Sequence, residues 1–97
     1  MPTFISLISQ TQHGEEDIKH SVERADAFRE TAGKLGANVR DVYWTLGGYD
    51  GVVVFDAPDD ETATALLLSL GTKGSVRTKT LRAFNGEQMT SILNTVP

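Results

Sequence analysis

The chain contains no cysteine among its 97 residues. Disulfide bonds, thiolate nucleophiles and cysteine metal ligands are therefore excluded. The chain also lacks an excess of basic residues, because 13 acidic side chains outnumber 9 lysines and arginines and leave a net charge of −4. Nucleic-acid binding requires a basic field or a basic stripe on the surface, so we expect no nucleic-acid partner.

Long apolar runs are absent as well. No stretch approaches the ~20 residues that a membrane-spanning helix requires, and residues 1–4 have neither the basic nor the apolar region of a signal peptide. The glycines match neither the dinucleotide-binding fingerprint nor a phosphate-binding loop, and no serine stands in a nucleophile elbow. We therefore expect a cytoplasmic protein without a membrane partner and without a cofactor.

The composition is that of an ordinary globular domain, with 39% hydrophobic and 23% charged residues. The chain shows no internal repeats, linkers or low-complexity segments, so residues 1–97 are predicted to form a single domain. A domain of this size buries only about 60–65% of the surface of its unfolded chain. Association with a second copy would therefore stabilise it noticeably.

Four segments have the apolar pattern of β-strands. Thr3–Gln10 and Val52–Phe55 are apolar on both faces, as expected for strands covered on both sides. Val39–Leu46 alternates, and the set formed by its even-numbered residues is expected to be the more buried one: Arg40, Val42, Trp44 and Leu46. Ser75–Phe84 is more polar, which predicts an edge strand or a strand facing a polar cavity.

Three segments have helical spacing. Acidic residues from Glu15 onward precede an apolar stripe that continues to Leu35, so one long helix is predicted after a break at residues 11–14, with Gly36 as its stop. A second helix is predicted to follow a carboxylate cap at residues 59–61 and to end at Gly71. Met89 to Val96 predicts a short terminal helix.

The order of elements is β-α-β-β-α-β plus a terminal helix. This order predicts a ferredoxin-like α+β fold, with a four-stranded antiparallel sheet and two helices on one face. The open face of such a sheet should be polar, but the first and third strands are apolar on both sides. A second copy packed sheet to sheet across a two-fold axis would cover that face. We therefore predict a homodimer through the sheet face, possibly assembling into a higher oligomer.

A glycine-rich turn stands at the midpoint of the chain, Gly47-Gly48-Tyr49-Asp50-Gly51. Gly-Gly and Asp-Gly pairs allow the positive φ angles of tight hairpin turns, and we expect such an angle at Gly48. Together with residues 57–60 and 74–84, the Gly-Tyr-Asp triplet resembles the GYD domain family. The resemblance implies a fold like that of the dimeric α/β-barrel proteins, whose members include cofactor-free monooxygenases, isomerases, haem-handling proteins and ligand sensors. The family itself implies no particular function.

Two classes of function fit this sequence. The first is a homodimeric module that binds a small molecule or an interaction partner. The second is a cofactor-free enzyme, similar to the monooxygenases or isomerases of this fold, acting on a small aromatic or carbonyl compound. A third hypothesis is that the chain forms a purely structural oligomer. A polar pocket with perturbed titratable groups would favour the enzyme, whereas a pocket lined only by apolar side chains would favour binding.

The candidate catalytic residues are Tyr49, Asp50 and His13. Tyr49 would donate a hydrogen bond to a ligand, and Asp50 would act as a base or an orienting acceptor. The alternative is structural, with Asp50 closing the turn and Tyr49 packing over the end of the hairpin. A metal site from His13, Glu16 and His20 has only weak support in the spacing, so we predict no metal.

Trp44 and Arg77 complete the set of candidate ligand-binding residues. Trp44 would form either a pocket wall or part of the core or interface. Arg77 shares a strand face with Lys79, and the pair would either hold an anion between two subunits or act as charges that protect a sheet edge.

Overall fold

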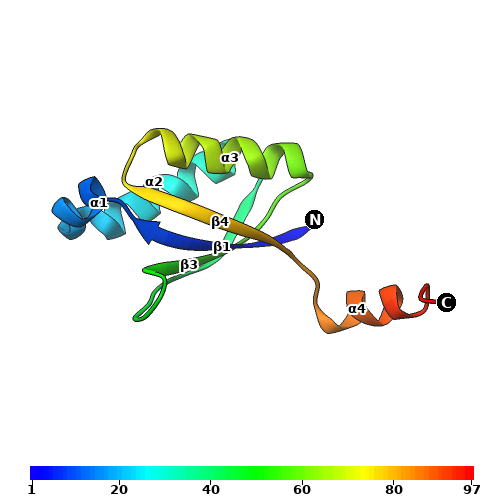
Figure 1. Cartoon of the computed structure of the whole chain (residues 1–97). Coiled ribbons are helices and arrows are strands. Elements are labelled where there is room, and N and C mark those ends of the chain that lie inside the picture. The colour runs from blue at the N-terminus through cyan, green and yellow to red at the C-terminus, as the bar shows by residue number, and fades with distance from the viewer.

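The computed structural model describes all 97 residues and confirms the predicted ferredoxin-like fold. Its antiparallel sheet has the strand order β2-β3-β1-β4, and α2 and α3 cover one face of it (Figure 1). The bounds of these elements are β1 Thr3–Gln10, α2 Ser21–Lys34, β2 Asn38–Trp44, β3 Gly51–Asp56, α3 Asp60–Thr72 and β4 Val76–Ala83. The central strands, β1 and β3, are the two that the sequence marks as apolar on both faces. The more polar β4 is an edge strand, as predicted.

The core lies between the sheet and the two helices. Phe55 of β3 is completely buried; its ring stacks on Phe4 of β1 at 5.4 Å and meets the edge of Phe28 of α2 at 6.3 Å, measured between ring centroids. Ala63 and Leu66 of α3 are also buried in this cluster. The apolar spacing of both helices therefore reflects packing onto one face of the sheet.

A β-bulge in β2 changes which residues of this strand face the core. The pairing with β3 shifts between Val39 and Asp41, because a bulge sets two residues of one strand against one residue of its partner. Val39 and Val42 consequently both pack against the core. The prediction that the set from Arg40 to Leu46 is the buried one therefore holds only for Val42. Val39 joins the core side, whereas Arg40 is exposed, Trp44 is 50% exposed and Leu46 is fully exposed.

The predicted long helix is divided in the structure. A first helix, α1 (Gln12–Glu16), is followed by a 3-10 turn, η1 (Ile18–His20), and only then by α2. The strand ends at Gln10, as the break at residues 11–14 predicted, but a helix begins earlier than expected, because the Thr11 hydroxyl accepts a hydrogen bond from the Gly14 N–H at 3.2 Å and caps α1. The change of direction between the helices leaves Ile18 and Val22 exposed, although their spacing matched the apolar stripe.

Local sequence features determine where α3 begins and where α2 ends. Asp59 caps α3, with its Oδ1 accepting a hydrogen bond from the Thr62 N–H at 2.7 Å, and Gly36 has a left-handed φ of 78° after α2. Both features were predicted. The expected stop at Gly71 is wrong, because α3 continues through it and the left-handed glycine is Gly74, with a φ of 76°.

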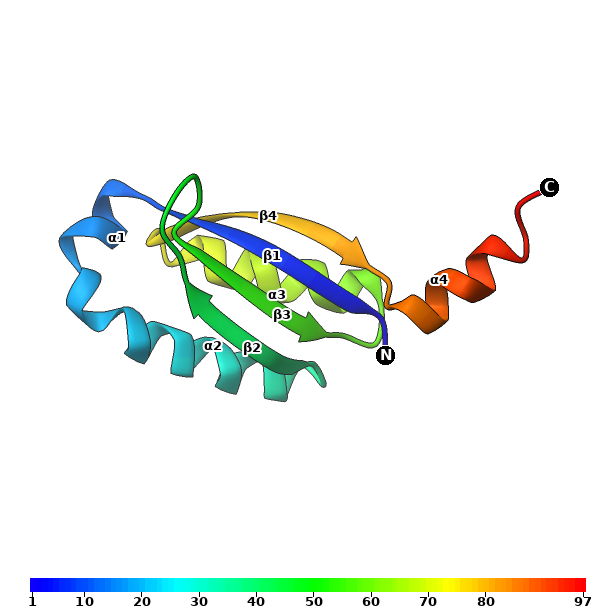
Figure 2. The ribbon, with the colours of Figure 1, turned by 90° about the horizontal axis from the view of Figure 1, so that it is seen from below.

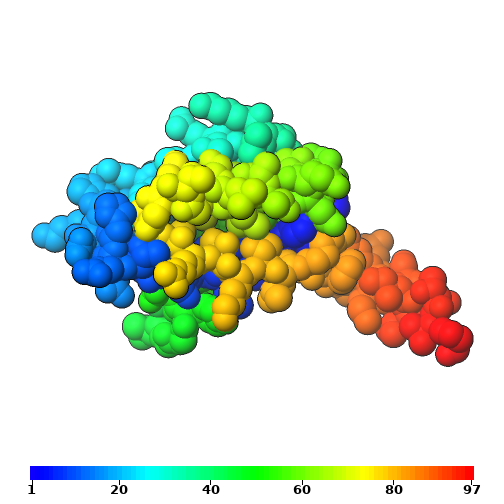
Figure 3. Space-filling model, turned by 45° about the horizontal axis from the view of Figure 1, so that its top comes forward, coloured from blue at the N-terminus to red at the C-terminus, as the bar shows by residue number.

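The terminal helix α4 (Gly86–Leu93) leaves the body of the domain. It extends beyond the end of the sheet, on the side away from α2 and α3, and forms a separate arm of the surface (Figures 1 and 3). Asn85 and Gln88 form a reciprocal capping box that defines its start. None of the helices has the length and apolar character needed to cross a membrane.

Candidate functional site

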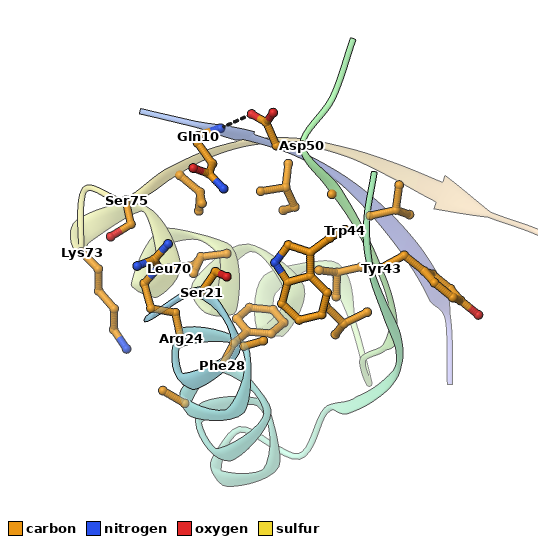
Figure 4. A pocket seen from close by; sticks show the side chains of 18 residues that line it. Gln10, Ser21, Arg24, Phe28, Tyr43, Trp44, Asp50, Leu70, Lys73 and Ser75 are labelled. Atoms are coloured by element: carbon orange, nitrogen blue, oxygen red, sulfur yellow. Dashed lines mark hydrogen bonds between the residues drawn. The ribbon is translucent and has the colours of Figure 1, made fainter. Parts of the chain in front are cut away.

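A cavity of about 120 Å³ lies between the helix side of the sheet and α2. It opens near the β2–β3 hairpin, with Trp44 on one side and Arg24 on the other (Figure 4). Its wall is mainly apolar, formed by Ile8, Phe28, Val42, Trp44, Val53 and Leu70. Its polar groups come from Gln10, Ser21, Arg24, Asp50, Lys73 and Ser75. This is the mixture expected of a ligand pocket, an apolar wall with a few polar groups.

Gly51 explains why space remains at this position. It pairs with Trp44 on one side and Ile8 on the other, so the cross-strand row on the helix side has no side chain at its centre. A Cβ atom at Gly51 would lie 2.9 Å from the carbonyl oxygen of Tyr43, closer than real Cβ atoms approach. The backbone therefore requires glycine here, and the missing side chain leaves room beside the Trp44 indole.

Asp50 borders the cavity and also holds the hairpin against β1. Its Oδ2 accepts a hydrogen bond from the Gln10 N–H at 2.7 Å, and its own N–H donates to the Ile8 carbonyl oxygen at 2.8 Å. Figure 4 shows the carboxylate at the rim, turned toward the Gln10 backbone. The Asp50 carbonyl oxygen also accepts a hydrogen bond from the Thr45 N–H at 3.1 Å, which closes the turn, the structural role that was the alternative to catalysis.

Tyr49 is not part of the cavity wall. Its ring lies 6.0 Å from the Lys79 ammonium, a cation–π contact, and its carbonyl oxygen accepts a hydrogen bond from the Thr45 hydroxyl at 2.7 Å. Lys79 pairs with Leu7, on the face of the sheet opposite the helices. The Tyr49 ring therefore contacts Lys79 on the open face of the sheet, whereas Asp50, although adjacent in sequence, borders the cavity on the helix side.

The glycine that allows this turn is Gly47, with a φ of 106°, whereas Gly48 has no positive φ. The expectation for Gly48 is therefore wrong by one position. The connection spans residues 45–50, longer than a two-residue turn, so the left-handed angle falls earlier in the loop than the Gly-Tyr-Asp triplet suggested.

His13 and Arg77 also lie away from the cavity. His13 belongs to α1, and Arg77 pairs with Ser9 on the sheet face that carries Lys79. The chain brings together no group of three or more histidine, aspartate or glutamate side chains placed to hold a metal ion. Of the predicted site residues, the structure brings only Trp44 and Asp50 together at the cavity.

Sequence reasoning missed most polar residues of the cavity, namely Gln10, Ser21, Arg24, Lys73 and Ser75. Arg24 is the one with the largest charged group. Its Nη1 donates to the carbonyl oxygen of Asp17 at 2.8 Å and to the Asp17 carboxylate at 3.0 Å. The same carboxylate is hydrogen-bonded to His20, which lowers the pKa of Asp17 and raises the pKa of His20. The helical spacing from Arg24 to Phe28 was the available signal, because residues four apart share a helix face.

Comparison with known proteins identifies a matching family and a similar protein. The sequence model of the GYD domain matches residues 4–93. A Thermus thermophilus protein named glutamine synthetase and cystathionine beta-lyase binding protein is 39% identical over 84 residues, which are 86% of this chain and 88% of that protein.

Two solved structures resemble the fold. The crystal structure of TTHA0845 from Thermus thermophilus has a TM-score of 0.55 at 28% identity, covering 89% of this chain and 96% of that one. A leucine response regulatory protein of Mycobacterium tuberculosis has a TM-score of 0.66 at 18% identity. That match covers 87% of this chain but 51% of the regulator, and it reflects a shared fold alone. On the family match and the Thermus relative, the chain belongs to the GYD domain family.

Proposed function

We propose that this chain is a protein-binding module that works as a homodimer. The observation that carries the proposal is the uncovered face of the sheet, which α2 and α3 leave open (Figure 2). The name of the Thermus relative, a binding protein for two enzymes, supports the same class of function. The enzyme alternative has less support, because Tyr49 and His13 lie away from the cavity that Asp50 borders.

Two cross-strand rows form the centre of the open face. The first consists of Tyr43, Val52, Leu7 and Lys79, and the second of Asp41, Val54, Ile5 and Leu81. Tyr43 and Leu81 are 59% and 52% exposed, and the four central aliphatic side chains are only partly covered by their neighbours. Contiguous apolar surface of this kind on a small domain marks an interaction site.

A second copy of the chain is the occupant that best fits this face. A two-fold axis running along the strands would place β4 of one copy over β2 of the other. Lys79 at one edge would then face the edge that carries Asp41 and Tyr43, while the central aliphatic rows would meet each other. Lys79 would lie over Tyr43 and near Asp41 of the other copy, while Arg40 at that edge is already paired with Asp56 at 3.7 Å.

Replacing Leu7 by aspartate tests the dimer. The substitution places a carboxylate at the centre of the proposed interface, where the cost of burying it exceeds the attraction of the neighbouring Lys79, so we expect the dimer dissociation constant to rise about 100-fold. Sedimentation equilibrium of parent and variant measures this change.

Leu68→Asp is the matched control. Leu68 is 65% exposed on α3, which covers the other face of the sheet, so this variant should dimerise like the parent. A parent protein that sediments as a monomer, or a Leu7→Asp variant that remains fully dimeric, would contradict the proposed interface.

Binding to an enzyme is tested directly with purified proteins. We expect the chain to bind glutamine synthetase or cystathionine beta-lyase of its own source organism with a dissociation constant in roughly the micromolar range, typical of transient interfaces. Sedimentation velocity with a labelled chain detects the complex, and an unrelated enzyme of similar size serves as the control. If neither enzyme changes the sedimentation of the chain at about 100 μM, the proposed partner class is wrong.

A further inference from the structure

We propose that the cavity beside Trp44 binds a small hydrophobic monocarboxylate, a compound of about the size of benzoate. The cavity lies between the sheet and α2, whereas the proposed dimer uses the opposite face of the sheet. This inference adds a ligand to the binding module and does not depend on the dimer. The two proposals can therefore fail separately.

The volume of the cavity sets the size of the ligand. At about 120 Å³ it has room for a single aromatic ring, as does an apolar cavity of about 150 Å³ that binds benzene in another protein, and the carboxylate of the ligand would lie at the opening beside Arg24. The wall beside Phe28, Trp44 and Leu70 offers aromatic and aliphatic contacts. A sugar or a nucleotide would exceed this volume, and its hydroxyl groups would lose hydrogen bonds to water without replacement along such a wall.

The polar groups at the cavity are mostly hydrogen-bond donors. Arg24 uses only Nη1 in its contacts with Asp17, so Nε and Nη2 of its guanidinium keep their N–H groups without a partner in the chain. Lys73 forms no ion pair with an acidic side chain and adds a second positive charge at the opening. The indole N–H of Trp44 is directed into the cavity (Figure 4).

Ser75 adds a hydroxyl to the cavity wall. The residue is only 4% exposed and lines the cavity, where its hydroxyl can donate a hydrogen bond to a ligand. The single carboxylate at the rim, Asp50, already accepts the Gln10 N–H. Arg24 keeps N–H groups free beside its ion pair with Asp17, Lys73 adds a positive charge, and the Asp50 carboxylate is turned toward the Gln10 backbone. The groups left for a ligand thus favour an anion, and a carboxylate matches the planar guanidinium.

The fluorescence of Trp44 tests the proposal, because it is the only tryptophan of the chain. Titration with benzoate is expected to change the emission saturably. Benzamide has the same shape without the charge and should bind at least about tenfold more weakly, because it loses the charge-assisted hydrogen bonds. Acetate lacks the apolar body and should give no saturable change at the same concentrations. Equal affinity for benzoate and benzamide, or no saturation with benzoate, would overturn the proposal.

Three variants locate the site. Ala25→Leu fills the cavity and should abolish binding of both benzoate and benzamide. Arg24→Gln should weaken benzoate about tenfold and leave benzamide unchanged, which also shows that the variant is folded. Arg29→Gln is the matched control, because Arg29 lies on the same helix outside the cavity and donates to the Val39 carbonyl oxygen. Unchanged benzoate affinity in Ala25→Leu would place the ligand elsewhere and overturn the assignment.

The dimer variant separates the two proposals. Leu7→Asp should retain the parent affinity for benzoate, because Leu7 belongs to the opposite face of the sheet. Loss of benzoate binding in a folded Leu7→Asp monomer would overturn the placement of the site within a single subunit.

Discussion

Replacing Gly14 by alanine is expected to cost about 3 kcal/mol of unfolding free energy. A Cβ atom at this position would lie 2.0 Å from the carbonyl oxygen of Ser75, far inside van der Waals contact. That oxygen accepts a hydrogen bond from the Thr11 N–H at 3.1 Å, so it has little freedom to move away. The substitution must therefore separate α1 from the segment that carries Ser75, a residue of the cavity wall.

Urea denaturation at fixed protein concentration measures the effect, since association with a second copy would otherwise contribute to the apparent stability. Gly33→Ala is the control. Gly33 lies within α2 and no atom would come within 4 Å of its added Cβ, so this variant should gain about 0.5–1 kcal/mol from the lower entropy of its unfolded chain. A Gly14→Ala protein as stable as the parent would contradict the close packing of α1 on Ser75.

Phe55→Ala is expected to destabilise the domain by about 3–5 kcal/mol, the usual range for removing a fully buried aromatic side chain. Phe55 has no exposed surface and touches the rings of Phe4 and Phe28, which join β1 and α2 across the core. The substitution removes both aromatic contacts and leaves a void at the centre of the cluster. A domain of this size is stable by only about 5–10 kcal/mol. The substitution should therefore remove a large part of the total free energy of unfolding.

Thermal denaturation followed by circular dichroism measures this loss, with an expected fall in Tm of at least about 12 °C. Phe84→Ala is the matched control, because Phe84 is 51% exposed after β4 and stacks only on Arg82 at 4.5 Å. It should change the unfolding free energy by less than about 1 kcal/mol. Equal losses in the two variants would show that Phe55 is not the centre of the core.

The candidate site was predictable in part. Asp50 stood out as a carboxylate within the glycine-rich turn and Trp44 as an aromatic residue of a strand, and both border the cavity. Tyr49 and Arg77 stood out for similar reasons but lie away from it, since a residue's side of the sheet depends on strand register. The only local signal for Arg24 was its helical spacing to Phe28, and Ser75 had none. They become part of one site only when α2 and the start of β4 are packed beside the hairpin.

By itself, the sequence determined the order of elements and the central position of β1 and β3. It also determined the Asp59 cap and the left-handed stop at Gly36. These features are local, because side-chain periodicity, cap chemistry and glycine φ angles act within a few residues.

Only the tertiary structure decided the bulge in β2, the division of the predicted long helix and the need for glycine at position 14. The bulge depends on pairing with β3, and Gly14 depends on the distant Ser75. The turn at Asp17 is held by Arg24, seven residues along the chain, whose side chain reaches back to it. The cavity arises in the same way. Its walls come from strands and helices whose spacing is set by the packing of the whole core, and no single segment encodes that distance.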